Sequence, residues 1–268
     1  MPSRVFSFLD QLARNPETDR RLWLDPGQRV VGRFLRCQLA SAFQPVIDLD
    51  GQASFAREAL VRSWHQSESQ LSPWSLFASA AHDDDVVELD RLCRTVHLLN
   101  HFSGRHADEA LFVNVHGRLL AAVAGDHGRS FRRVLDALAI PPSRVIIETP
   151  ESVCLDRALL AFVVANYRLN GFRISVSVGR AGDVPEVLGI VRPDYLKVDG
   201  RRISGVDEAA HLAALSAANG VRLIVQRIEA RESLAWIESA GIRLVQGFAF
   251  GAPEAVPVQP ATLATSAA

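Results

Sequence analysis

The sequence predicts an α/β protein whose main domain is a modified (β/α)8 TIM-like barrel with an antiparallel first strand. From residue 111 onward, short apolar runs recur, and most are separated by helix-length segments, which indicates repeated βα units with buried parallel strands. Before them, two apolar runs flank Asp50-Gly51, a dipeptide typical of a hairpin turn, so the first two strands are expected to be antiparallel. About eight strands fit, which favours a closed barrel over the alternative, an open doubly wound sheet.

Composition and charge exclude several classes of protein. The 268 residues are 48% hydrophobic and 22% charged, which is typical of a folded domain and excludes a disordered chain. Its 29 basic and 30 acidic residues give a net charge of -1, so neither nucleic acid nor an anionic membrane is an expected partner. No apolar stretch reaches the roughly 20 residues that span a bilayer, and the N-terminus lacks a secretory signal. A cytoplasmic location is therefore expected.

The first part of the chain is predicted to contain an extension, a helix and the hairpin. Residues 1–28 are polar and include two prolines, and they are expected to form an N-terminal extension. A short helix is expected over 29–38. The hairpin strands are expected over 43–49 and 54–62, and the barrel domain as a whole over 29–254.

The remaining elements follow from capping signals and apolar runs. Ser72-Pro73 places an N-cap residue before a proline at the first helical position, and the acidic run 82–85 is expected to be a solvated loop that caps the next helix. Helices are expected over 73–81, 86–102, 156–170, 207–219 and 231–240. Strands are expected over 111–115, 144–148, 173–178, 194–199, 222–226 and 243–247. The residues 255–268 are rich in Pro, Ala and Thr and predict a flexible tail.

Several of the predicted strands end in a single polar residue. The carboxyl ends of parallel barrel strands form one rim, where functional residues gather. These residues are Asn114, Glu148, Lys197, Gln226 and Gln246. One such residue is normally a satisfied loop contact, but five of them together with Glu58, inside the apolar run FAREALV, predict a converging polar site. The lysine among them is the only lysine of the chain. Its place at the barrel rim fits a functional role and chance equally well.

At these residues the chain resembles the EAL domain, a family that binds and hydrolyses the bacterial second messenger cyclic di-GMP. The resemblance runs from about Arg29 to Pro253 and rests on seven motifs in the family's order. They are FQPVIDL, REALVR, VVELDR, FVNVHG, VIIETPES, DYLKVDG and VQGFAFGAP. Any one short motif is weak support, whereas seven in order are specific.

The resemblance implies a ligand-binding site for cyclic di-GMP. By this resemblance Gln44 would meet a guanine base, Arg62 would contact a phosphate, and Asn114 would lie on the metal-binding strand. The ligand-binding residues that it predicts are Gln44, Glu58, Leu60, Arg62, Asn114, Glu148, Lys197 and Gln246. The motifs VIIETPES and DYLKVDG also include Glu151 and Asp199, which match acidic residues of the family.

The chain departs from the family's pattern at acidic positions. Where the family has two adjacent aspartates followed by Phe-Gly-Thr-Gly, this chain reads SVGRAG, with Ser177 and Val178 in the aspartate positions and Arg180 in the loop. Where the family has Ala-Glu-Gly-Val-Glu, this chain reads VQRIE, so Gln226 replaces the first glutamate and Glu229 keeps the second. In active relatives the two aspartates hold Mg²⁺ or Mn²⁺.

These departures predict that the protein has no catalytic residues and no metal cofactor. Two-metal hydrolysis needs carboxylates to hold the cations, and here Glu58, Asn114 and Glu148 remain only as vestigial ligands. A site that loses carboxylates and gains Arg180 becomes less attractive to Mg²⁺ and more attractive to phosphate.

The sequence therefore predicts a catalytically inactive EAL-like domain that binds cyclic di-GMP without hydrolysing it, as a receptor or effector. One alternative is a nucleotide-free regulatory protein that acts on a partner protein or through a homodimer. The other is an active phosphodiesterase with an unusual metal set, which the loss of three acidic positions disfavours. Asp183 is the only candidate carboxylate in the loop after Val178, and its offset is unfavourable for recruitment. Hydrolysis assays with Mg²⁺ and Mn²⁺ separate this last alternative from the others.

Overall fold

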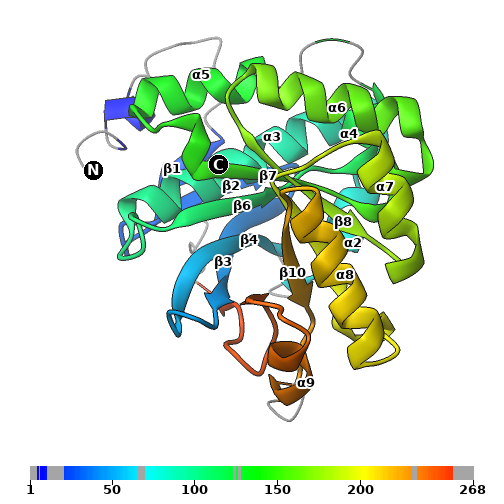
Figure 1. Cartoon of the computed structure of the whole chain (residues 1–268). Coiled ribbons are helices and arrows are strands. Elements are labelled where there is room, and N and C mark those ends of the chain that lie inside the picture. Colours follow the sequence, from blue (N-terminus) through cyan, green and yellow to red (C-terminus); the bar gives the residue numbers. More distant parts are fainter. Residues whose placement is uncertain are drawn as a thin grey trace, which may run out of the picture.

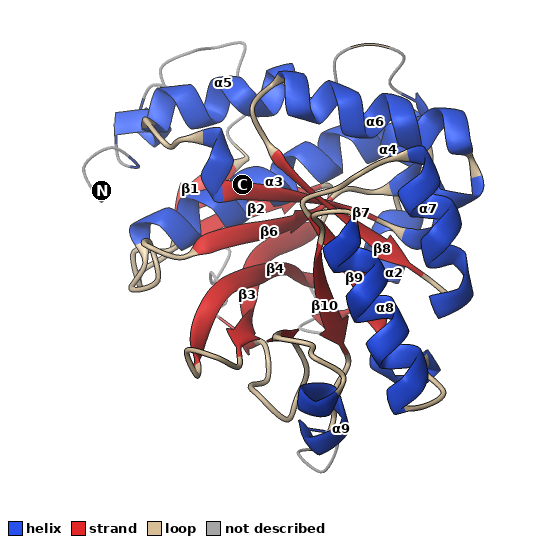
Figure 2. Cartoon of the chain, viewed as in Figure 1, coloured by secondary structure: helices blue, strands red, loops and turns tan. Residues whose placement is uncertain are grey.

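The computed structural model describes residues 5, 7–10, 21–65, 70–122, 125, 128–230 and 234–255. Within these residues eight strands close into a barrel, and helices pack around its outside (Figure 1, Figure 2). The predicted modified barrel is therefore confirmed, and the open sheet is wrong because β3 and β4 pair to close the ring.

The barrel strands run in the order β3, β11, β10, β9, β8, β7, β6, β4. Strand β3 (Cys37–Asp48) is antiparallel to both of its barrel neighbours, β4 (Ala53–His65) and β11 (Leu244–Val245). A tight turn around Asp50-Gly51 joins β3 directly to β4, which only an antiparallel pair allows. The parallel strands are β6 (Ala110–Asn114), β7 (Val145–Thr149), β8 (Arg173–Val178), β9 (Tyr195–Asp199) and β10 (Arg222–Gln226).

The helices lie between successive strands of the barrel, as the βα pattern predicts. The longest are α3 (Asp83–Ser103), α6 (Arg157–Leu169) and α8 (Val206–Ala218). The shorter ones are α2 (Pro73–Ala78), α4 (Gly117–Ala122), α5 (Arg129–Leu138), α7 (Val184–Ile190) and α9 (Leu234–Ser239). Short 3-10 turns are η1 (Pro142–Arg144), η2 (Glu151–Leu155), η3 (Ala181–Asp183) and η4 (Gly200–Arg202). No helix of the described residues is long and apolar enough to cross a membrane.

Local capping explains where several helices begin. The Ser72 hydroxyl accepts the backbone N–H of Ser75 at 3.0 Å, as its position before Pro73 predicts. The acidic run 82–85 caps α3, but the expectation of a loop is wrong for its three aspartates, which form the first turn of the helix. Carboxylates are favourable there because they face the positive end of the helix dipole.

The predicted helix over 29–38 is also wrong. These residues form β2 (Val30–Phe34), a tight turn and the start of β3, with which β2 pairs. The β-branched valines at the start of β2 favour a strand, and Leu35 makes the turn with φ of 51°. Asn100 of α3 bonds both the N–H and the C=O of Val30 at 2.8 Å, a distant contact that holds the strand in place.

The sheet continues beyond the barrel at both ends of the described chain. Strand β1 (Leu22–Leu24) pairs with β2, so part of the predicted N-terminal extension belongs to the sheet. Strand β5 (Gln70–Leu71) pairs with β4, and β12 (Glu254–Ala255) pairs with β3. Residues 11–20 of the predicted extension, 231–233 of the predicted helix and 256–268 of the predicted tail lie outside the described residues.

Among the described residues, the buried apolar side chains form three clusters, of which one lies within the barrel. The outer core lies between the barrel wall and the helices. The inner cluster, here named the barrel floor, consists of Val46, Ala56, Phe112, Ile146, Tyr195, Ile224 and Leu244. Because side chains alternate between the two faces of a strand, the residues two positions nearer the mouth, where the parallel strands end, also point into the barrel above this floor.

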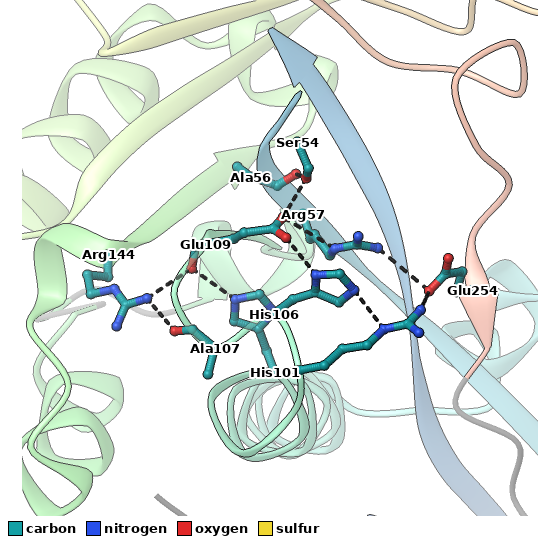
Figure 3. Close-up of polar contacts among 10 residues, drawn as sticks. Ser54, Ala56, Arg57, His101, His106, Ala107, Glu109, Arg144 and Glu254 are labelled. Carbon is teal, nitrogen blue, oxygen red and sulfur yellow. Dashed lines mark hydrogen bonds and ion pairs between the residues drawn. The ribbon is translucent and has the colours of Figure 1, made fainter. Parts of the chain in front are cut away.

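A polar network on the outer side of β4 ties β12 to the barrel (Figure 3). Glu109, which precedes β6, accepts a hydrogen bond from Ser54 at 2.5 Å and lies 2.6 Å from His106 Nδ1. Its carboxylate also lies 3.3 Å from Nε of Arg57, a residue that is only 7% exposed. Arg57 in turn lies 3.8 Å from the carboxylate of Glu254.

We expect Glu109→Gln to destabilise the protein by about 1–3 kcal/mol, because it leaves the buried Arg57 guanidinium without its nearest anion. Urea denaturation measures this change. The matched control is Glu186→Gln, which removes an exposed carboxylate 3.4 Å from Arg157 and should change stability by less than about 0.5 kcal/mol. Equal effects of the two substitutions would contradict a stabilising role for the network.

Candidate functional site

A layer of polar side chains lies inside the barrel directly above the floor, and we name it the polar layer. On all seven floor strands the residue two positions nearer the mouth is polar, as Glu58 follows Ala56 and Lys197 follows Tyr195. Ser177 joins the layer because it is the register partner of Lys197. The polar layer consists of Gln44, Glu58, Asn114, Glu148, Ser177, Lys197, Gln226 and Gln246. The polar residues that the sequence places at strand ends thus converge on one end of the barrel.

Lys197 is the centre of the polar layer. Its side chain has no exposed surface, and its Nζ donates to Glu58 Oε2 at 2.8 Å and to Glu148 Oε2 at 2.6 Å. The ammonium also lies 4.7 Å from the centre of the Phe112 ring in the floor below. One buried cation therefore joins two carboxylates from β4 and β7.

The amide side chains and a hydroxyl complete the hydrogen bonding of these carboxylates. Glu58 accepts from Asn114 Nδ2 and from Gln246 Nε2, each at 2.8 Å. Glu148 accepts from Ser177 Oγ at 2.8 Å. Every oxygen of the two carboxylates therefore has at least one donor within the layer. Gln246 Oε1 is a buried oxygen for which the described residues supply no donor.

The charges in the layer shift the pKa values of all three ionisable groups. Burial alone would raise the pKa of Glu58, but the Lys197 ammonium and three hydrogen bonds outweigh it and the pKa is lowered. For Glu148, burial and the nearby Glu58 charge prevail over the ammonium, so its pKa is raised. Burial opposes the charged form of Lys197, yet the two carboxylates together raise its pKa.

Leu60 and Arg62 extend the site above the polar layer along β4. They follow Glu58 at alternate positions and therefore lie on the same face of the strand. Gln44 of β3 is the register partner of Glu58, and it donates to the carbonyl of Gly251 at 3.1 Å. Arg62 is half-buried and donates to the carbonyl of Val61 at 3.1 Å, and burial lowers the pKa of its guanidinium.

Val178 differs from the other predicted positions. It is 3% exposed and belongs to the core between barrel wall and helices, whereas the neighbouring Ser177 hydroxyl points to Glu148 inside the barrel. The two residues in the family's aspartate positions thus face different environments. Gln226 is half-buried at the mouth, where it is the register partner of Asp199.

The donor set of this layer does not fit a pair of divalent cations. The Lys197 ammonium lies between the two remaining glutamates, and each of their oxygens already accepts a hydrogen bond. Ser177 is a neutral group whose hydroxyl donates a hydrogen bond to Glu148, and Val178 offers no ligand atom. In the part of the chain that the structure describes, no three His, Cys, Asp or Glu side chains are grouped to hold a metal ion.

A second group of charges lies one step further out, at the ends of β9 and β10. Asp199 is 5% exposed and binds Arg201 through Nε at 3.1 Å and Nη2 at 2.9 Å. Arg227 Nη1 lies 3.2 Å from the same carboxylate. The hydrogen bonds from Arg201 lower the pKa of Asp199 against the opposing effect of burial. Sequence reasoning missed Arg227, although it stands where the family motif has glycine.

The structure is thus an α/β barrel with a layer of polar side chains at the carboxyl ends of its parallel strands. A family model described as the EAL domain matches residues 28–253, so this chain belongs to the EAL domain family. The family membership expected from the seven motifs is therefore confirmed.

Individual relatives agree with this assignment. The bifunctional diguanylate cyclase/cyclic di-GMP phosphodiesterase MucR of Pseudomonas aeruginosa is 25% identical over 236 residues, which cover 81% of this chain and 33% of MucR. The chain thus spans about a third of that relative's length. The Bacillus subtilis YkuI protein, solved with cyclic di-GMP and calcium, is 25% identical with a TM-score of 0.68, over 82% of this chain and 57% of YkuI.

A further solved structure supports the fold alone. Klebsiella pneumoniae BlrP1, in a calcium and cyclic di-GMP complex, has a TM-score of 0.71 at 21% identity. The match covers 84% of this chain and 57% of BlrP1. A likeness at this identity shows that the two chains share the barrel.

Proposed function

We propose that this EAL domain binds cyclic di-GMP at the mouth of its barrel without hydrolysing it, and so acts as a receptor or effector. The observation that carries the proposal is the polar layer itself. It keeps Gln44, Glu58 and Glu148 together, while a neutral Ser177 hydroxyl contacts Glu148 where the family pattern has a carboxylate. The site is built to retain a ligand and is poorly equipped to activate water.

The absence of hydrolysis follows from what two-metal chemistry requires. The cations would have to activate water and stabilise the charge that develops on the phosphate, and carboxylates must hold them in place. Here Ser177, Val178 and Gln226 supply no charge at three positions that are acidic in the family. The two glutamates that remain already neutralise one buried ammonium between them.

Binding of the nucleotide is supported by the residues above and beside the layer. Gln44 and Arg62 lie on the facing strands β3 and β4, where an amide can pair with a guanine edge and a guanidinium with a phosphate. Relatives with the same barrel, such as YkuI, have been solved with cyclic di-GMP.

Isothermal titration with cyclic di-GMP in Mg²⁺ and again in EDTA tests the proposal. We expect similar affinity in both buffers and no hydrolysis with Mg²⁺ or Mn²⁺. Hydrolysis at the rate of an active phosphodiesterase would refute the non-hydrolytic part. Absence of binding in both buffers would refute the receptor role.

Arg62→Ala is expected to weaken cyclic di-GMP binding about 10- to 100-fold, because a charge-assisted hydrogen bond contributes about 1.5–3 kcal/mol. The matched control is Arg243→Ala, which removes an arginine that pairs with Asp50 at the other end of the barrel. The control should bind as wild type does. Equal cyclic di-GMP affinity of the two variants would show that Arg62 does not contribute to binding.

A second candidate function is regulation of a partner protein without nucleotide. Leu155 and Leu169, near the two ends of α6, are 88% and 87% exposed, and this candidate would use them as apolar contacts with a partner. Failure to bind cyclic di-GMP in both buffers, combined with a folded protein, would support this candidate over the first.

A further inference from the structure

We propose that arginine side chains at the barrel mouth take the electrostatic place of the metal ions in this chain, with Arg227 as a phosphodiester-binding residue. This inference rests on the proposed function, because its ligand is the phosphodiester of cyclic di-GMP. It follows from the backbone at Arg227, its contact with Asp199 and the charge of the mouth.

The backbone of Arg227 is unusual for an arginine. Its φ of 62° lies in the left-handed region, which favours glycine and costs other residues stability. The family motif has glycine at this position, whereas this chain reads VQRIE. The side chain is 57% exposed, so packing does not account for an arginine here. Strain of this kind at a ligand-binding rim points to a functional side chain.

The Arg227 guanidinium is a second cation beside Asp199, whose carboxylate oxygens already accept hydrogen bonds from Arg201. Asp199 accepts the backbone N–H and two guanidinium N–H groups of Arg201, which together occupy both of its oxygens. Arg227 adds only one contact, from Nη1 at 3.2 Å. Asp199 thus acts as a positioning residue that holds the second guanidinium over the mouth, where its other N–H groups can meet a ligand.

The position of Asp199 places this contact next to the polar layer. It follows Lys197 at an alternate position on β9, so its carboxylate lies one step nearer the mouth on the inner face. Gln226, the residue before Arg227, is the register partner of Asp199 on β10. Arg227 therefore stands beside one of the positions that lost a carboxylate.

The charge balance of the mouth has changed by about the amount that two metal ions would supply. Relative to the family pattern, two inward-facing carboxylates are replaced by the neutral Ser177 and Gln226, and two glycines by Arg180 and Arg227, a change of four positive units. Two divalent cations contribute four. Arg180 is exposed just after β8, and within the described ranges no ion pair engages it. The mouth can therefore attract a phosphodiester without metal.

The substitution of arginine for metal also separates binding from hydrolysis. A guanidinium donates paired hydrogen bonds to phosphate oxygens and remains charged at all physiological pH values. It neither binds nor activates a water molecule as a divalent cation does. The same change that restores positive charge therefore leaves the phosphodiester intact.

The test is titration of cyclic di-GMP into wild type and Arg227→Gly, each in EDTA and in Mg²⁺. We expect Arg227→Gly to lose at least tenfold in affinity in EDTA while its melting temperature does not fall, because glycine adopts the left-handed backbone freely. Arg227→Asn is the second variant, since asparagine tolerates this conformation without carrying the charge. It should show the same loss.

Gln28→Gly is the matched backbone control. Gln28 has φ of 60° in the turn before β2, so the same relief of strain occurs there without the loss of a charge. This control should leave affinity unchanged. If both Arg227 variants bind as tightly as wild type, the inference is overturned and the proposed function stands. Wild-type binding only in Mg²⁺ also overturns it, and no wild-type binding in either buffer refutes the proposed function first.

Discussion

Replacing Lys197 by methionine is expected to destabilise the protein by about 3–5 kcal/mol and to abolish cyclic di-GMP binding. The ammonium is fully buried and makes hydrogen bonds of 2.8 and 2.6 Å to two glutamates that are themselves buried. Without it, Glu58 and Glu148 would face each other with their charges uncompensated. Methionine has a similar length and fills the space above the floor, so the loss reports on charge more than on volume. Urea denaturation at neutral pH measures it.

The double variant Lys197→Met/Glu148→Gln is the control for this prediction. Removing one of the two carboxylates removes their mutual repulsion, so the double variant should recover part of the stability lost by Lys197→Met. Glu148 is the better choice, since its pKa is already raised by burial and by Glu58 in the wild type. A double variant less stable than Lys197→Met would contradict charge repulsion as the cause.

The pH dependence of Lys197→Met gives a second check. Without the ammonium, burial raises the pKa values of both glutamates in the folded state above those in the unfolded chain. The folded state then binds protons more tightly, so the penalty is complete above the folded pKa values and is relieved as the pH falls through them. The stability difference from wild type should therefore shrink in acid. A difference that stays constant with pH would point to lost packing.

The variant Ser177→Asp/Val178→Asp/Gln226→Glu, which restores the acidic positions of the family, is expected to gain metal-dependent stability and hydrolysis that wild type lacks. With Mn²⁺ at about 100 times its Kd, its melting temperature should rise by about 5–10 °C. The metal-free variant should be less stable than wild type, since the new carboxylates join Glu58 and Glu148 in a buried layer. Thermal scans with Mn²⁺ and with EDTA measure both effects.

The different surroundings of the two aspartate positions determine the control for this experiment. Val178 packs in the outer core, so Val178→Asp alone should destabilise the protein. Ser177→Asp/Gln226→Glu leaves that core intact and tests the inward-facing positions separately. An equal shift of the wild-type melting temperature by Mn²⁺ would show that the native donor set already holds the metal and would contradict the prediction.

The elements that follow most directly from the sequence are those whose signal is local. The strands 173–178 and 222–226 have the predicted bounds because each is a short apolar run flanked by polar residues. The predicted helix over 29–38 is wrong for the opposite reason. Its residues are strand because β3 and Asn100 of α3 pair with them, and no local pattern carries that information.

The candidate site also has a part that local sequence signals predict and a part that depends on distant contacts. A polar residue at a strand end is visible in the sequence, so Asn114, Glu148, Lys197 and Gln246 can be grouped from the order of residues alone. Their hydrogen bonds cannot, because partners such as Lys197 and Glu58 are 139 residues apart and meet only when the barrel closes. The left-handed backbone of Arg227 is equally hidden from sequence reasoning.

The barrel class, the family and the residues that gather at the mouth all follow from the amino-acid sequence, since hydrophobic periodicity, strand-end polarity and motif order are properties of neighbouring residues. Three features of the site emerge only in the folded chain: Lys197 bridges both glutamates, Val178 faces away from Ser177, and Arg227 and Arg201 share Asp199. These features depend on distance, burial and direction in space, which closure of the ring fixes all at once.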